Sequence, residues 1–351
     1  MAVSADKLLI VGPAWIGDMV MAQSLYKLLQ SRHTGLRIDV IAPPWSKPIL
    51  DRMPEVNRAI ELDVAHGEAA VGTRRKLGRR LRSRGYRRAI VLPRSLKSAL
   101  VPFFAAVPVR TGYRGEWRFA LINDARPFDP ARLDQTVKRF IALGLPKDDE
   151  ELPLPPQPLL RTDEENLRSA VQRLGLTPTP ATVAVMPGAA YGPAKRWPAD
   201  RFGALAARLA GAGSQVWLLG SESERKIGEA VRVAADHDDV INLCGRTTLA
   251  DAVDLLGAAA VAVTNDSGLM HVAAAVDTHV ISLYGSTTPR FTPPLTERKD
   301  VLYTNLDCSP CFRRKCPLGH FNCMMGMSVD DVANVAMAAL DGRSAVRAQP
   351  W

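Results

Sequence analysis

One stretch of the chain combines a predicted strand, a polar turn and a predicted helix in a way that suits anion binding. Residues 261–264 are a short apolar run typical of a buried strand, and the Ala-rich segment after Gly268 has high helix propensity. The turn between them predicts bare backbone N–H groups at a helix N-terminus, where phosphate is attracted. Ser267 and Gly268 are small enough to allow a close approach, and His271 falls about one turn into the helix. The alternative is an ordinary strand-to-helix turn in which Asp266 only caps the helix.

The loop after the first predicted strand offers a lone carboxylate. Gly12 and Gly17 have the spacing of a nucleoside-triphosphate loop, but Asp18 and Met19 replace the Lys and Ser or Thr that such a loop requires. A carboxylate there repels phosphate, so the sequence argues against an ATPase. Near a helix N-terminus, Asp18 is expected to keep a low pKa and to serve as a base toward a hydroxyl group. The alternative is that Asp18 merely caps the helix.

Residues 187–198 form a second predicted loop, rich in small residues and also following a strand. Gly188 permits a ligand to come close, and Lys195 can meet a phosphate as a point charge, the alternative being an ordinary surface lysine. Glu222 follows the next strand, where a carboxylate can accept hydrogen bonds from ribose or sugar hydroxyls. It could equally be a solvated acid at the start of a helix.

Two patterns raise the question of a metal, and neither predicts a catalytic one. Residues 236–238 read Asp-His-Asp, like the D-x-D of metal-dependent transferases, but they follow a helix rather than a strand. Four of the five cysteines are spaced C-x2-C-x4-C-x6-C, which could hold a structural zinc ion or remain reduced thiols in an ordered loop. These four are Cys308, Cys311, Cys316 and Cys323.

Charge is distributed very unevenly along the 351 residues. Residues 1–160 hold 26 Lys and Arg against 16 Asp and Glu, a balance of +10, whereas residues 161–351 hold 19 against 20. Nine of the cations lie between Arg74 and Arg88 with no acid among them. Such a run is most often a solvated face, but the bias also suggests a polyanionic partner. Sparse aromatics make nucleic acid a weaker choice than an anionic membrane surface or a phosphorylated glycolipid.

The order of predicted elements indicates an α/β protein with two doubly wound domains. Strands are expected at 7–11, 38–42 and 89–92, with a helix over 19–30, and again at 182–186, 215–219, 240–243, 261–264 and 279–283, with a helix at 162–174. Four prolines within residues 151–158 predict a stiff linker. We therefore expect domains over 1–160 and 161–335, facing each other across a cleft, and a tail over 336–351. No signal peptide and no membrane span is expected.

With these residues in hand, the chain resembles the bacterial ADP-heptose:lipopolysaccharide heptosyltransferases, inverting glycosyltransferases with the GT-B fold. The resemblance runs from about Leu8 to the end of the cysteine cluster and rests on residues 12–18, 192–198, 265–271 and 291–294. Ser267 and the first loop favour the heptosyltransferase II branch over heptosyltransferase I.

The resemblance implies transfer of heptose from ADP-heptose to the first heptose of the lipopolysaccharide inner core on lipid A, without a metal or other cofactor. Asp18 matches the family's catalytic base and Lys195 its contact to the donor phosphates. The donor set is expected to comprise Gly188, Lys195, Glu222, Thr247, Asp266, Ser267, Gly268 and His271, and the acceptor set Trp15, Arg94 and Lys97. The enzyme is expected in the cytoplasm, in peripheral contact with the inner leaflet of the inner membrane, with no nucleic-acid partner. A transferase of another donor sugar remains an alternative, as does a non-catalytic binder of anionic glycolipid or nucleic acid.

Overall fold

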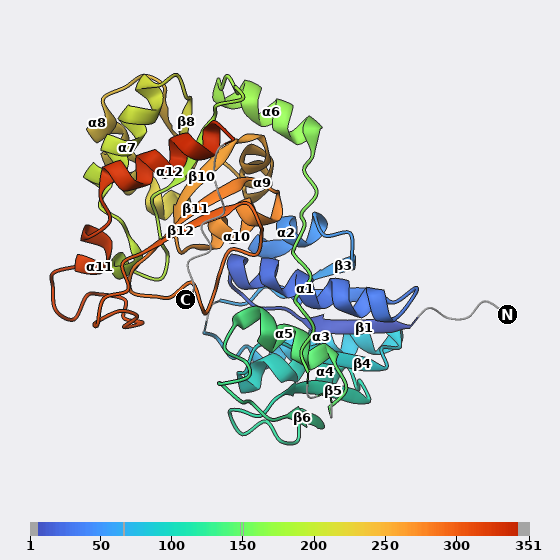
Figure 1. The fold of residues 1–351 in the computed structure, drawn as a ribbon. Coiled ribbons are helices and arrows are strands. Elements are labelled where there is room, and N and C mark those ends of the chain that lie inside the picture. The colour runs from blue at the N-terminus through green and yellow to red at the C-terminus, as the bar shows by residue number, and fades with distance from the viewer. Residues whose placement is uncertain (1–5, 66, 148, 150, 343–351) are drawn as a thin grey trace. The chain divides into compact units, whose positions relative to one another are not determined.

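The computed structural model describes residues 6–65, 67–147, 149 and 151–342. Its internal contacts divide the chain into two compact units, Met1–Pro158 and Leu159–Trp351. The sequence placed this boundary after residue 160. Figure 1 shows each unit as a sheet with helices on its faces.

The first unit is built on a six-stranded parallel sheet in the order β3-β2-β1-β4-β5-β6. Its strands are β1 (Lys7–Val11), β2 (Arg37–Ala42), β3 (Val56–Glu61), β4 (Arg88–Val91), β5 (Val109–Tyr113) and β6 (Asp124–Arg126). The helices are α1 (Ile16–Arg32), η1 (Pro44–Ser46), α2 (Lys47–Asp51), α3 (Val71–Leu81), η2 (Arg82–Arg84), η3 (Leu96–Ala99), α4 (Leu100–Phe104) and α5 (Thr136–Gly144). Helices α3 and α4 contribute to one core with the strands, while α1 packs against α5.

The second unit repeats this plan with the order β12-β11-β10-β7-β8-β9. Its strands are β7 (Val183–Met186), β8 (Val216–Leu218), β9 (Val240–Asn242), β10 (Val261–Asn265), β11 (His279–Tyr284) and β12 (Lys299–Tyr303). The helices are α6 (Glu164–Leu174), η4 (Pro193–Lys195), α7 (Ala199–Gly211), η5 (Glu222–Glu224), α8 (Arg225–Ala235), α9 (Leu249–Ala258), α10 (Gly268–Ala275), α11 (Asn322–Met325) and α12 (Val329–Leu340). Helices α7, α8 and α12 pack one core against the sheet.

Local sequence explains where these helices begin. The Asp163 side chain accepts hydrogen bonds from the N–H groups of Glu165 and Asn166, which caps α6, and Gly175 ends that helix with φ +67°. Thr248 and Asp251 form a reciprocal capping box at the start of α9. Capping satisfies N–H groups that would otherwise lack partners at a helix start.

The structure corrects several predicted elements. Helix α1 begins at Ile16 rather than at residue 19, so the end of the predicted loop is its first turn. The predicted tail is wrong at its start, because α12 continues to Leu340 and Ala336 is fully buried in the core. Residues 343–351 of that tail lie outside the described part of the chain. Strands β3, β5, β6 and β12 were not anticipated.

The proline-rich linker is extended and is held against α1. Ser24 Oγ donates to the carbonyl oxygen of Pro156 at 2.6 Å, and Lys27 Nζ donates to that of Gln157 at 2.8 Å. After the linker, the Leu160 N–H donates to the carbonyl oxygen of Ala275 at 2.8 Å. Both ends of the connection are therefore fixed to the unit beside them.

Candidate functional site

In each unit the candidate residues lie where the strand order reverses. The second sheet starts at β7, continues to β8 on one side and returns to β10 on the other, and the first sheet does the same at β1, β2 and β4. Ligands of open α/β sheets bind at this point, beyond the carboxyl ends of the strands. Lys195 and Asp266 follow β7 and β10, and Asp18 and Arg94 follow β1 and β4. The topology therefore gives each unit one candidate site.

Asn265 ties the loop after β7 to the end of β10. Its buried side chain accepts from the Trp197 N–H at 2.9 Å and donates to the Pro187 carbonyl at 2.8 Å. Both amide ends are thus used, which fixes the loops after β7 against the end of β10. From the sequence alone, Asn265 had no predicted role beyond its place in the motif.

Asp266 is a charge partner rather than a helix cap. Lys195 Nζ donates to Asp266 Oδ2 at 2.6 Å, and Thr287 Oγ1 donates to the same oxygen at 2.6 Å. The two side chains of the ion pair are only 14% and 6% exposed. Ser267, not Asp266, occupies the N-cap position of α10, and its side chain makes no capping hydrogen bond. The alternative that Asp266 only caps the helix is therefore wrong.

The start of α10 therefore offers an anion site next to a cation. The N–H groups of the first turn are not capped by Ser267, whose hydroxyl lies 3.3 Å from Thr264 Oγ1 instead. Gly268 is the first helical residue. Lys195 keeps two further N–H donors after its bond to Asp266, and its ammonium also lies 5.0 Å from the Tyr191 ring centre.

His271 lies in the first turn of α10 and is 4% exposed. Burial lowers the pKa of His271 to about 4, and the nearby Lys195 ammonium acts in the same direction, whereas Asp266 opposes it. The imidazole is therefore neutral at neutral pH. It adds a polar group, without charge, beside the Lys195–Asp266 pair.

Gly188 lies against a side chain of the next loop. A Cβ atom at this position would collide with the carboxylate of Glu224, so the glycine makes room for that side chain. Glu224 in turn accepts from the Ser221 N–H at 2.8 Å and closes a capping box at η5. This packing requires a glycine at position 188, and its place in the donor set stays a prediction.

Glu222 and Thr247 lie at the same edge of the sheet as Lys195. Glu222 follows β8, is two-thirds exposed and pairs with Arg225 at 3.2 Å. Thr247 is half-buried after β9, and the glycine two residues before it, Gly245, is packed against the Glu222 side chain. Glu222 and Thr247 therefore belong to adjacent loops, which follow β8 and β9 on one side of the point where the strand order reverses.

In the first unit, Asp18 occupies the first turn of α1 and is half-buried. Trp15 occupies the N-cap position of α1, and its side chain makes no capping hydrogen bond, so Asp18 is not the cap. Trp15 is 50% exposed. Arg94 is exposed and its guanidinium lies 4.2 Å from the Phe128 ring centre, while Lys97 lies in η3 and is half-buried.

Sequence reasoning missed Arg139 in this site. Its guanidinium lies over the same Phe128 ring at 5.0 Å. Burial lowers the pKa of Arg139, the neighbouring Arg94 lowers it further, and the Tyr113, Asp134 and Asp18 side chains raise it. Arg139 sits on α5, far along the chain from the first loop, so no spacing pattern could reveal it.

Two residues after β11 were also missed in the second site. Thr287 bonds Asp266, and the Ser286 hydroxyl is buried with no hydrogen-bond partner among the described residues. Since buried polar atoms are normally satisfied, Ser286 has spare hydrogen-bonding capacity close to the pair. A Gly-Ser-Thr-Thr run after a strand was the available signal.

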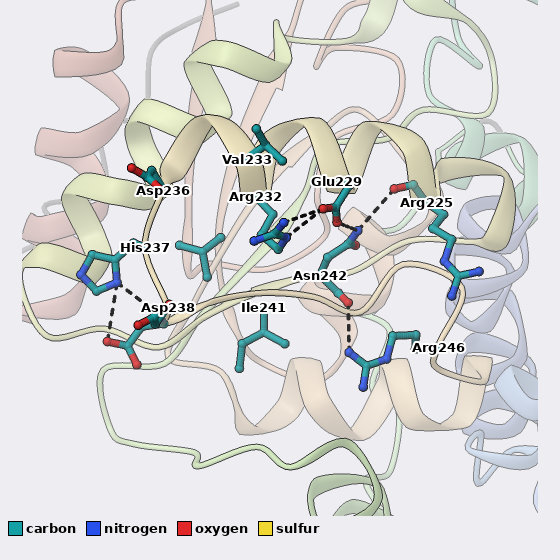
Figure 2. Close-up of a pocket in the computed structure, with 12 residues that line it drawn as sticks. Arg225, Glu229, Arg232, Val233, Asp236, His237, Asp238, Ile241, Asn242 and Arg246 are labelled. Atoms are coloured by element: carbon teal, nitrogen blue, oxygen red, sulfur yellow. Dashed lines mark hydrogen bonds and ion pairs between the residues drawn. The ribbon is translucent and has the colours of Figure 1, made fainter.

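The Asp-His-Asp segment lines a different pocket, of about 930 Å³, between α8 and the edge strand β9 (Figure 2). Its lining side chains largely satisfy one another. Arg232 donates to Glu229 at 2.7 Å, Asn242 donates to Glu229 at 3.2 Å, and His237 Nδ1 lies 3.7 Å from Asp239. The segment precedes β9, at the amino end of a strand, which is the wrong edge for the site described above.

The four clustered cysteines are the other candidate for a metal site. All of them are free thiols, and no group of three or more His, Cys, Asp or Glu among the described residues is arranged to hold a metal ion. Burial raises the pKa of the Cys323 thiol, and the other three clustered thiols raise it further. The four thiols therefore lie close enough to act on one another, and the zinc interpretation of the cluster stays a prediction.

Comparison with known proteins agrees with this arrangement. The profile of glycosyltransferase family 9 (heptosyltransferase) matches residues 74–322. Lipopolysaccharide heptosyltransferase 2 of Escherichia coli K12 is 45% identical over 84% of this chain and 87% of its own length. Lipooligosaccharide heptosyltransferase 2 of Haemophilus influenzae is 42% identical over 84% of this chain and 88% of its own.

A solved structure extends the match to the fold. The structure of E. coli ADP-heptose lipopolysaccharide heptosyltransferase II superposes with a TM-score of 0.87 at 40% identity, covering 97% of this chain and all of that one. The expected fold class, two Rossmann-like α/β domains as in GT-B enzymes, is confirmed. The chain belongs to glycosyltransferase family 9, the heptosyltransferases, and is a glycosyltransferase.

Proposed function

We propose that this protein transfers heptose from ADP-heptose to the first heptose of the lipopolysaccharide inner core, the reaction of heptosyltransferase II. The Lys195–Asp266 pair beside the uncapped start of α10 is the observation that carries the proposal. A cation and helix N–H groups at one spot suit a diphosphate. The high identity to enzymes named heptosyltransferase 2 supports the choice of donor and acceptor.

In the proposed reaction, the second unit stabilises the leaving ADP. The Lys195 ammonium and the N–H groups at the start of α10 face the negative charge that develops on the diphosphate as the sugar–oxygen bond breaks. Charge placed in advance in this way is usually the largest catalytic contribution. Glu222 and Thr247 are proposed to contact the ribose side of the donor.

Asp18 of the first unit is proposed as the base. It removes the proton of the acceptor hydroxyl while the oxygen attacks the anomeric carbon from the face opposite to ADP, which inverts the configuration. Trp15, Arg94 and Lys97 are proposed to bind the acceptor. Arg139 interacts electrostatically with Asp18 and is proposed to belong to the same site.

The acceptor is a lipid, so we also propose that the enzyme works from the cytoplasm at the surface of the inner membrane. No helix in the described ranges is long and apolar enough to cross a bilayer. Attachment would therefore be peripheral, and nucleic acid is not proposed as a partner.

Product formation from the purified protein tests this function. ADP-heptose is incubated with a core acceptor that carries one heptose, and the product mass is measured with and without excess EDTA. The expected result is an acceptor heavier by one heptose, at the same rate in EDTA, because Lys195 and α10 supply the positive charge that a metal would otherwise provide. An acceptor that stays unmodified contradicts the proposed identity of the donor or of the acceptor. Activity that disappears in EDTA contradicts the metal-free mechanism.

A further inference from the structure

One side of the first unit's sheet is covered by a strongly basic layer. The layer consists of α3, the η3–α4 helix and the connection 114–123 between β5 and β6. The two longer stretches of sequence that include these segments, residues 71–87 and 94–123, contain thirteen Lys or Arg and a single acid, Glu116. We call the outer side of this layer the α3–α4 face.

The three segments are one continuous layer because they share a core. Leu77 of α3, Val101 of α4 and Ile122 of the connection are buried together against the sheet. Gly78 lets α4 come close, since a Cβ there would lie 2.6 Å from the Phe104 Cβ. These apolar side chains thus point toward the sheet, and the cations and aromatic residues described below occupy the outer side of the layer.

Most of the α3 cations point outward. Arg74 is the exception, because its guanidinium donates to the Ala69 carbonyl at 2.7 Å and is buried. Helix α3 contains no acidic residue that could neutralise the others. The exposed cations of this helix are Arg75, Lys76, Arg79 and Arg80.

Exposed aromatic rings accompany these cations. Trp117 is 88% exposed and Phe119 is 71% exposed, and their rings meet edge to face at 6.3 Å. Phe103 of α4 is 40% exposed, with the Arg110 guanidinium 5.7 Å from its ring centre. Large apolar side chains this exposed mark interaction surfaces.

The loop that presents Trp117 and Phe119 is held firmly from behind. The buried Arg118 between them donates to the Pro93 and Tyr113 carbonyl oxygens, both at 2.7 Å. Glu116 accepts from the Leu96 N–H at 2.7 Å, so the only acid of the layer is used within it. The two rings are therefore exposed by a fixed loop.

We propose that the α3–α4 face docks onto an anionic lipid bilayer, with Trp117 and Phe119 entering the headgroup region and the α3 cations lying over the lipid phosphates. This deepens the membrane contact of the proposed function and rests on it for the biological setting. Two signals together, basic and apolar, are what stable peripheral binding requires. A single-stranded nucleic acid fits less well, because successive bases need a series of rings to stack on, whereas Trp117 and Phe119 meet edge to face as a single pair.

Vesicle co-sedimentation tests the proposal on the full chain. Vesicles of phosphatidylcholine mixed with phosphatidylglycerol should bind the protein, binding should weaken as salt is raised, and phosphatidylcholine alone should bind little. At about fivefold per cation, neutralising four cations should weaken binding by at least about 10²-fold. The Trp117→Ser/Phe119→Ser variant should lose about tenfold or more. The four-cation variant is R75Q/R79Q/R80Q with K76Q.

A matched variant removes the same charge from the second unit. Its four cations are exposed on helices of the second unit, which contribute nothing to the α3–α4 face, and it should bind vesicles like the unchanged protein. The control substitutions are R168Q, R208Q, K226Q and R232Q. Equal losses in the two variants would show that only net charge matters and would overturn the proposal.

Transferase activity separates this inference from the proposed function. With a detergent-free, delipidated acceptor in solution, both face variants should keep their turnover, whereas with acceptor embedded in anionic vesicles their turnover should fall. Unchanged vesicle binding in both face variants overturns the docking surface even if the enzyme is active. Tighter binding to an RNA oligomer than to anionic vesicles overturns it in favour of nucleic acid.

Discussion

Lys195 and Asp266 define the charge at the start of α10. The pair is nearly buried, and the only other side chain bonded to the Asp266 carboxylate by a described contact is Thr287. A buried ion pair of this kind fixes the positions of its two side chains but adds little to the free energy of unfolding. Here it fixes the ammonium next to the helix N–H groups that are proposed to hold the diphosphate.

Replacing Lys195 with Ala should weaken donor binding and slow turnover together. A hydrogen bond from a charged group contributes about 1.5–3 kcal/mol, which corresponds to roughly 10- to 100-fold in affinity for ADP-heptose. Titration calorimetry measures the affinity, at a temperature where thermal unfolding shows the variant to be folded. Lys226→Ala, an exposed lysine of α8, is the control and should bind normally. Equal affinities for Lys195→Ala and its control would remove Lys195 from the phosphate site.

His271 should make the second unit sensitive to acid. Its pKa of about 4 in the folded chain lies below the unfolded value of about 6.5. The unfolded state therefore binds a proton first, and stability falls as the pH drops from about 6.5 toward about 4. In His271→Gln, the loss of unfolding free energy between pH 7 and pH 4.5 should be smaller by about 2 kcal/mol, measured by urea unfolding. Parallel losses in both proteins would contradict the assignment.

Helices α7 and α8 hold the loops after β7 and β8 in place, and they meet at a glycine. A Cβ at Gly203 would lie 2.5 Å from the Ala234 Cβ of α8. Close packing of two helix backbones leaves no room for a larger residue. The positions of Lys195 and Glu222 thus depend on contacts well behind the site.

Gly203→Ala should destabilise the protein by about 1–3 kcal/mol through overpacking between α7 and α8. Gly211, at the end of the same helix, has no atom within 4 Å of an added Cβ. Gly211→Ala should therefore be neutral or stabilise by up to about 1 kcal/mol. Chemical denaturation of the two variants measures the difference. A Gly203→Ala variant as stable as Gly211→Ala would show that the contact is not tight.

Elements with strong local patterns could be predicted from the sequence, and those without could not. Strands β1, β7, β10 and β11 could be predicted from their apolar runs, because strands buried on both faces are largely hydrophobic in sequence. Strand β6 has three residues, two of them charged, and β3 is mostly exposed, so neither shows such a run. The first turn of α1 was read as loop because Gly17 interrupts its helix propensity.

The same limit applies to the site. Asp18, Lys195 and Asp266 sit in short motifs next to strands, so their type and spacing reveal them. Arg139 and Thr287 act through contacts with distant segments, which only folding brings together. For Gly188, folding adds a second reason for a glycine, since an added Cβ would collide with Glu224.

Both units of the chain use one plan, with the same strand order and one candidate site at the reversal of that order. The proposed division of chemistry follows from the charges at those two points. The second site has a cation and a helix start suited to a diphosphate, and the first has a half-buried carboxylate suited to a base. The proposed reaction needs both sites. A change in the second site should weaken donor binding and slow turnover, whereas a change of the carboxylate in the first site should slow turnover alone.

Comparing Asp18→Asn with the unchanged protein tests this account most directly. Turnover of ADP-heptose with the heptose-bearing acceptor is followed by product mass, and donor affinity is measured on the same samples. The amide keeps the shape of the side chain but cannot accept the proton, so turnover should fall by about 10²-fold or more while donor affinity stays within about twofold. Turnover close to normal, or a loss of donor affinity as large as the loss of turnover, would contradict the role of Asp18 as the base.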